Sequence, residues 1–116
     1  TAEIINKKQI KKIYDNRIQE RNPGNLEGKP WDTTDRNEYW NYYSETKFGT
    51  EESVKELFSR VHAFLDELKN KNFDSVLVVA HSGVSKAFYG YFNGVPEDGN
   101  FLHLGLKNGD IAEYEF

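Results

Sequence analysis

The residues best suited to chemistry are His81, Ser82 and Gly83, which directly follow the unbroken apolar run at residues 76–80. Such a run, with its β-branched residues, is typical of a strand buried in a parallel sheet. Ligands of open α/β sheets bind beyond the carboxyl ends of the strands, where the next helix presents unpaired backbone N–H groups. Gly83 allows close approach to the backbone. The sequence therefore predicts that His81 faces an anion, with phosphate the first candidate; the alternative is a histidine that only caps or packs.

A second candidate is the carboxylate of Glu20, which lies between Arg17 and Arg21 at the start of a polar loop over residues 15–34. A structureless loop of about 20 residues is uncommon in a compact domain and is often functional. Glu20 could act as a general acid and base, and an arginine could bind a phosphate. By composition alone, most charge clusters of this kind are solvated surface, so that alternative stays open here.

The remaining candidates are weaker. His62 lies on a predicted long helix, where surface or edge packing is expected, and His103 lies in a predicted hairpin, where a structural role is expected. The three histidines do not have the spacing of a metal site, so no metal is predicted. Trp40, Tyr42 and Tyr43 could line a pocket, but a packed lid helix is the preferred interpretation.

Helices are expected to position these residues. The pattern predicts helices over residues 1–14 and 35–45, then a long helix that Thr50 can cap. A second amphipathic helix follows Gly83 and stops at Asn93-Gly94. The apolar stripe of the long helix consists of Val54, Leu57, Phe58, Val61, Phe64, Leu65 and Leu68.

The C-terminal region carries a hairpin signal. Residues 101–106 and 111–116 flank the dipeptide Asn108-Gly109, which favours a two-residue hairpin turn. With the buried strand at 76–80 and the helices, this pattern predicts an α/β fold with a mixed sheet.

Composition limits the classes of function. The chain has 116 residues, which fits one domain or a large piece of one, and its net charge of −4 is spread along the sequence without a basic patch. We therefore expect no nucleic-acid partner. The chain contains no cysteine, which is compatible with the cytoplasm. It has no apolar stretch near the ~20 residues needed to span a bilayer and no signal peptide at its start, so no membrane partner is expected.

At this point several stretches together resemble the histidine phosphatase superfamily, which includes the phosphoglycerate mutases. The resemblance runs along residues 1–116 in the correct order and identifies them as the C-terminal part of such a domain. It implies a three-layer α/β/α fold with a mostly parallel sheet and a C-terminal hairpin, incomplete at the N-terminus. The matching stretches are the second-histidine motif at 78–84, the arginine–leucine–x–glutamate segment at 17–21 with Gly24, Leu26 and Gly28, the pairs Glu52-Ser53 and Arg60-Val61, and the end of a Gln-Thr-Ala element at Thr1-Ala2.

The resemblance also implies roles for individual residues. In the family, a histidine in an Arg-His-Gly strand attacks phosphorus, and water then hydrolyses the phosphohistidine. By this resemblance Glu20 protonates the leaving oxygen and later activates the water, and His81 and the Ser82 N–H stabilise the equatorial oxygens. Arg21 is the corresponding phosphate-binding arginine. The resemblance implies no metal and no cofactor.

The Arg-His-Gly strand and a following Ser-x-Leu-x-Arg segment would lie before Thr1, and neither His62 nor His103 follows a buried strand that could replace them. We therefore expect this chain to be a shortened form of the domain, a processed product or a gene remnant, and to be inactive alone. An apolar strand without neighbours would also leave an open edge. The chain is thus expected to form a homo-oligomer or to receive the absent segment from another chain.

Three functions stay open. Mutases resemble this chain but carry a longer insertion where residues 29–51 stand, and Asn22 and Pro23 replace a histidine and a tyrosine typical of mutases. A phosphomonoesterase acting on a small phosphorylated substrate is therefore favoured over a phosphoglycerate mutase-type phosphotransferase. The remaining alternative is a non-catalytic module that binds phosphate or regulates.

Overall fold

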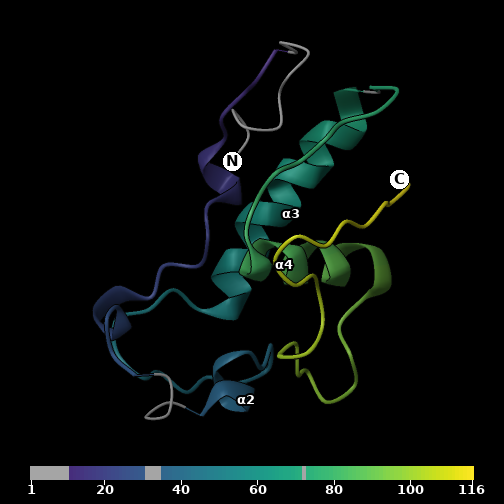
Figure 1. The fold of residues 1–116 in the computed structure, drawn as a ribbon. Helices are drawn as coiled ribbons and strands as arrows, with labels where there is room; N and C mark the ends of the chain where they lie inside the picture. Colours follow the sequence, from purple (N-terminus) through teal and green to yellow (C-terminus); the bar gives the residue numbers. More distant parts are fainter. Residues whose placement is uncertain (1–10, 31–34, 72) are drawn as a thin grey trace.

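The described part of the protein consists of helices joined by long irregular segments (Figure 1). The computed structural model describes residues 11–30, 35–71 and 73–116. Its elements are listed in chain order: the 3-10 turns η1 (Asn16–Ile18) and η2 (Gly24–Leu26), then the α-helices α2 (Arg36–Tyr39), α3 (Val54–Lys71) and α4 (Ser82–Asn93). None of the described helices is both long and apolar enough to cross a bilayer.

The long helix α3 confirms the strongest periodic pattern in the sequence, but its cap differs from the expectation. The Ser53 hydroxyl accepts the N–H of Glu56 at 3.0 Å, so Ser53 caps α3 at its start. The Thr50 hydroxyl instead accepts the N–H of Asn25 at 2.8 Å, which fastens the loop around η2. The prediction that Thr50 caps the helix was therefore wrong by three residues.

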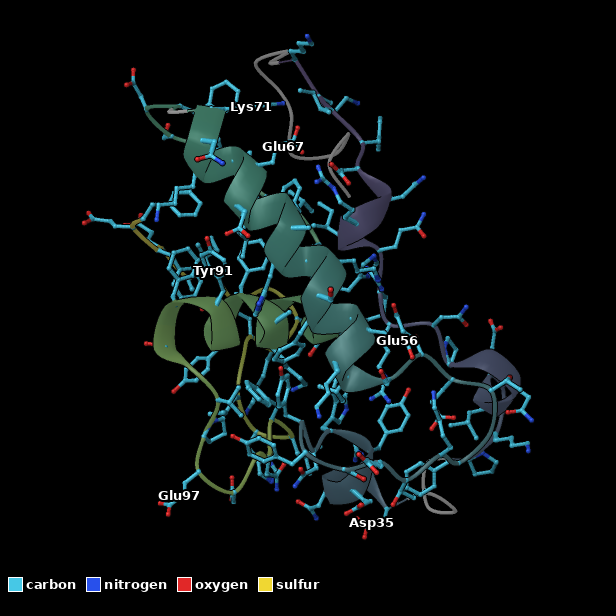
Figure 2. The ribbon with its side chains drawn as sticks, turned by 180° about the vertical axis from the view of Figure 1, so that it is seen from behind. Asp35, Glu56, Glu67, Lys71, Tyr91 and Glu97 are labelled. Carbon is cyan, nitrogen blue, oxygen red and sulfur yellow. The ribbon has the colours of Figure 1, made fainter. Side chains whose placement is uncertain are left out.

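The core forms where α4 packs against α3. The largest fully buried side chains come from both helices and from the segment after α4: Phe58, Phe101, Leu57, Leu65, Val61 and Val84. Phe58 meets Phe101 edge to face, with ring centres 4.8 Å apart. Gly90 lets the backbone of α4 come close, since a Cβ there would lie 2.9 Å from Phe58 Cε2. The hydroxyl of Tyr91, seen on α4 in Figure 2, donates to Asp66 on α3 at 2.7 Å.

The predicted three-layer α/β/α sandwich with its mostly parallel sheet was wrong for the described residues, which form no strand. Residues 76–80 run extended from the end of α3 back to the start of α4, with no strand pairing (Figure 1). Val76 is 49% exposed and Leu77 78% exposed. The apolar β-branched run favours an extended backbone, but strand formation also requires a second backbone to complete the ladder.

The predicted C-terminal hairpin was also wrong, although its turn is present. Gly109 has φ +83° and Asp110 N–H donates to the carbonyl of Lys107 at 3.1 Å, as expected for the Asn-Gly signal. Its flanks nevertheless do not pair. Tyr114 stacks on Phe92 of α4 with ring centres 4.6 Å apart and planes 7° apart. Aromatic packing on α4 thus takes the place of backbone pairing.

The two N-terminal helix predictions have different outcomes. Residues 1–10 of the predicted helix 1–14 lie outside the described residues, and residues 11–14 are not helical. The predicted helix 35–45 is much shorter, because α2 ends at Tyr39 and Tyr42 N–H donates to the carbonyl of Gly99 at 2.7 Å. One isolated antiparallel bridge, Asn41 with Asn100, is the β-pairing found in the described residues.

We propose that residues 76–80 pair with a second chain. Exposed apolar extended segments with open backbone groups are templates for association. Leu77→Lys should therefore shift the chain toward the monomer in light scattering at micromolar concentration. Ile111→Lys is the matched control, because Ile111 is 86% exposed in another extended segment. A wild-type chain that is already a stable monomer would contradict this proposal.

Candidate functional site

The carboxylate of Glu20 lies against the first turn of α4. Its Oε2 accepts the N–H of Gly83 at 3.1 Å and its Oε1 accepts the N–H of Arg21 at 2.8 Å. Gly83 is required for this approach, because a Cβ there would lie 2.1 Å from Glu20 Oε1. Since Gly83 comes two residues after His81, the structure brings the Glu20 loop to the motif that contains His81 and Ser82.

His81 is the N-cap residue of α4, with extended backbone angles of φ −118° and ψ 166°. Its side chain is exposed and makes no capping hydrogen bond. Ser82 is the first helical residue, and its hydroxyl donates to the carbonyl of Leu106 at 3.3 Å. The first N–H groups of a helix have no intrahelical acceptor, and the helix dipole adds positive potential there. This end of α4 therefore suits an anion, and a carboxylate already lies there.

Arg21 points into the protein. Its side chain is nearly buried; Nε donates to the carbonyl of Glu52 at 2.7 Å and Nη1 to the carbonyl of Tyr39 at 2.6 Å. The guanidinium carbon lies 3.8 Å from the centre of the Tyr39 ring. Burial lowers the pKa of Arg21. These contacts link the Glu20 loop to α2 and to the approach to α3, while the phosphate-binding role of Arg21 stays a prediction.

Arg60 on α3 supports the backbone of the Glu20 loop, a role that the sequence did not reveal. Its Nη1 donates to the carbonyls of Arg17 and Gln19, at 2.8 and 2.7 Å, and its Nη2 to the carbonyl of Glu20 at 3.1 Å. Nε and Nη2 also bind the two carboxylate oxygens of Glu52, both at 2.8 Å. A conserved-looking Glu and Arg eight residues apart near one helix was the available signal, since this spacing is close to two helical turns.

The ion pair of Glu52 with Arg60 should make folding sensitive to acid. Burial would raise the pKa of Glu52, but hydrogen bonds from Arg60 and from Asn22 N–H outweigh it and hold the pKa below the ordinary 4.5. A lowered carboxyl pKa adds stability that is present above pH ~4.5 and lost as pH falls through the lowered pKa. The difference in free energy of unfolding between wild type and Glu52→Gln should therefore shrink from pH 7 to pH 3.

Urea unfolding at both pH values measures this difference. Glu97→Gln is the control, since Glu97 is exposed (labelled in Figure 2) and should lower stability little at either pH. A wild-type advantage over Glu52→Gln that is as large at pH 3 as at pH 7 would contradict the assignment.

A hollow of about 180 Å³ lies beside this region. Its walls include Arg21, Tyr39 and Glu51, but neither Glu20 nor His81. The Glu51 carboxylate accepts the N–H groups of Phe48 and Gly49, at 3.0 and 2.9 Å. The hollow is therefore lined by groups that fix the loop before α3.

The weaker candidates take structural positions. His62 Nε2 lies 3.0 Å from the carbonyl of Ala87, and its ring packs against Phe58 and Tyr91, as expected for edge packing. His103 is exposed. No cluster of three or more metal-ligating side chains is found in residues 11–30, 35–71 and 73–116.

Comparisons with known proteins identify the family. The model of the histidine phosphatase superfamily (branch 1) matches residues 1–116. A relative in Hydrogenobacter thermophilus, named "Putative phosphoserine phosphatase 2", is 28% identical over 107 residues, which cover 87% of this chain and 52% of the relative. The chain thus spans about half the length of that curated relative. No solved structure matches the chain significantly. On the family match over its whole length, this chain belongs to branch 1 of the histidine phosphatase superfamily.

Proposed function

We propose that this chain supplies the acid/base half of a phosphomonoester hydrolase of the histidine phosphatase type. The observation that carries the proposal is the Glu20 carboxylate at the N–H of Gly83, 3.1 Å away, immediately beyond His81 at the start of α4. A proton donor, a histidine and helix N–H groups at one place are the groups that phosphoryl transfer needs. Membership of the superfamily supports the same reaction class.

In the proposed reaction, the imidazole of an Arg-His-Gly strand attacks phosphorus and the bond from phosphorus to the ester oxygen breaks. Glu20 gives its proton to that leaving oxygen. Water then attacks the phosphohistidine, Glu20 takes the proton from the water, and inorganic phosphate leaves. His81 and the Ser82 N–H stabilise the charge on the equatorial oxygens. Arg21 is proposed to add positive potential from below the Glu20 loop.

The substrate is proposed to be a small phosphomonoester. The name of the Hydrogenobacter thermophilus relative points to phosphoserine. Phosphoglycerate mutation is the second candidate, but only residues 29–51 connect the Glu20 loop to the Glu52-Ser53 pair, which is short for a mutase. A phosphate-binding module without catalysis is the third.

Hydrolysis of an aryl phosphate tests the proposal. The 116-residue chain alone should show negligible turnover, because His62 is packed between helices and no described histidine other than His81 adjoins Glu20. A protein that joins this chain to an Arg-His-Gly strand should turn over the substrate and form an acid-labile phosphohistidine. Turnover by the chain alone that is lost in His81→Ala would show a different nucleophile. A joined protein that binds phosphate without turnover would favour the non-catalytic module.

A further inference from the structure

Lys86 is a buried lysine on α4 that the proposed reaction does not use. Its side chain is only 6% exposed. The ammonium donates to the carbonyls of Leu102 and Leu104, at 3.0 and 2.9 Å. Burial lowers the pKa of Lys86, and the negative charge of Glu20 opposes that shift. A buried ammonium bonded to two backbone carbonyls is costly to place and must therefore fix the groups around it.

The second contact of Lys86 is with Trp40. The ammonium lies 5.2 Å from the centre of the indole, and the Arg21 guanidinium lies 5.0 Å from it. The indole also reaches the acid site, because a Cβ on Gly83 would lie 2.9 Å from Trp40 Cη2. Two cations that attract one aromatic ring restrict its position. Trp40 thus forms a wall beside the Glu20 carboxylate and the Gly83 N–H.

The segment that Lys86 holds, residues 102–106, covers the start of α4. Leu106 N–H donates to the Ser85 hydroxyl at 2.8 Å, and the Ser82 hydroxyl donates to the carbonyl of Leu106. Gly105 has φ +86°, and a Cβ there would lie 2.7 Å from Ser85 Oγ and 3.0 Å from Lys86 N. Residues 102–106 therefore lie directly on the turn that carries the proposed phosphate-binding N–H groups.

We propose that Lys86 is a positioning residue, which holds residues 102–106 and the Trp40 indole on the first turns of α4 so that the Glu20 carboxylate stays at the Gly83 N–H. This inference rests on the proposed function for its catalytic meaning, but its geometry does not. Without the ammonium, two carbonyls would lose their donor and Trp40 would lose one of its two cations. The carboxylate of Glu20 would then be free to leave Gly83.

Amide hydrogen exchange in the 116-residue chain tests the proposal, because it reports local opening at single N–H groups. Lys86→Met removes the charge and keeps the apolar stem, whereas Lys86→Arg keeps the charge. We expect Lys86→Met to speed exchange at Gly83 and Leu106 by about tenfold relative to Val61 in the core of α3. Lys86→Arg should return both sites to within about threefold of wild type. If Lys86→Met does not fold, Lys86→Gln gives the same comparison.

Lys55→Met is the matched control, since Lys55 also lies near an aromatic ring, 5.5 Å from the centre of Tyr42, but is exposed. It should leave exchange at Gly83 and Leu106 unchanged. Equal acceleration at Gly83, Leu106 and Val61 would mean that Lys86 acts only on global stability and would overturn the proposal. Unchanged exchange in Lys86→Met would overturn it as well. Failure to detect phosphatase activity would leave this test unaffected.

Discussion

Glu20→Gln should lower kcat/KM for phosphomonoester hydrolysis by about 10²–10⁴-fold in a protein that joins this chain to an Arg-His-Gly strand. The glutamine amide oxygen can still accept the N–H of Gly83, which Glu20 Oε2 accepts at 3.1 Å, so the loop geometry should persist. The amide cannot give a proton to the leaving oxygen or take one from water. Loss of proton transfer with retained geometry is therefore the specific consequence of this change.

The dependence on the leaving group sharpens this experiment. An alkyl phosphate needs protonation of its leaving oxygen, whereas a nitrophenolate leaves with much less help, so the loss should be greater for the alkyl ester. Glu27→Gln is the matched control, because Glu27 is an exposed carboxylate in the same loop region, and it should leave kcat/KM unchanged. An equal loss in both carboxylate variants, or the same loss for both esters, would remove the acid/base role from Glu20.

The largest expected effect on stability is that of Phe58→Ala. Phe58 is 2% exposed and packs on Phe101 and Tyr42, with ring centres 4.8 and 5.5 Å away. Removing a buried aromatic ring costs about 3–5 kcal/mol, from lost burial and from the cavity left behind. Because whole domains are stable by only about 5–15 kcal/mol, this variant should be close to unfolded at room temperature.

Urea unfolding followed by circular dichroism measures this effect. Phe73→Ala removes the same ring from a position that is 57% exposed, so its cost should stay within about 0.5 kcal/mol. If the two variants lose similar stability, the packing of α3 against α4 and Phe101 is not the core of this protein.

Helices could be predicted from the sequence where the apolar pattern was long. The stripe of α3, from Val54 to Leu65, and the Asn93-Gly94 stop of α4 were sufficient. Cap positions were less certain, because Thr50 and Ser53 both carry a hydroxyl and only the loop contact with Asn25 separates their roles. The sheet could not be predicted, since the run at 76–80 favours an extended backbone and says nothing about a neighbour to pair with.

The candidate site shows a similar division. The approach of Glu20 to Gly83 spans 63 residues of chain, and the family resemblance rather than composition suggested it. The inward direction of Arg21 and the burial of Lys86 depend on contacts with Tyr39 and Leu102, which are also distant in sequence. Charged residues are usually exposed, so composition predicts the opposite for both.

The most direct test of the central claim, that the start of α4 beside Glu20 binds a phosphoryl group, is an NMR titration of the 116-residue chain with inorganic phosphate. The account predicts that the largest amide shifts occur at Ser82 and Gly83. It also predicts that Glu20→Gln binds phosphate at least as tightly, because the competing negative charge is gone. Shifts that cluster elsewhere, for example around Glu51 and Ser53 in the neighbouring hollow, or no saturable shift at Ser82 and Gly83, would contradict the account.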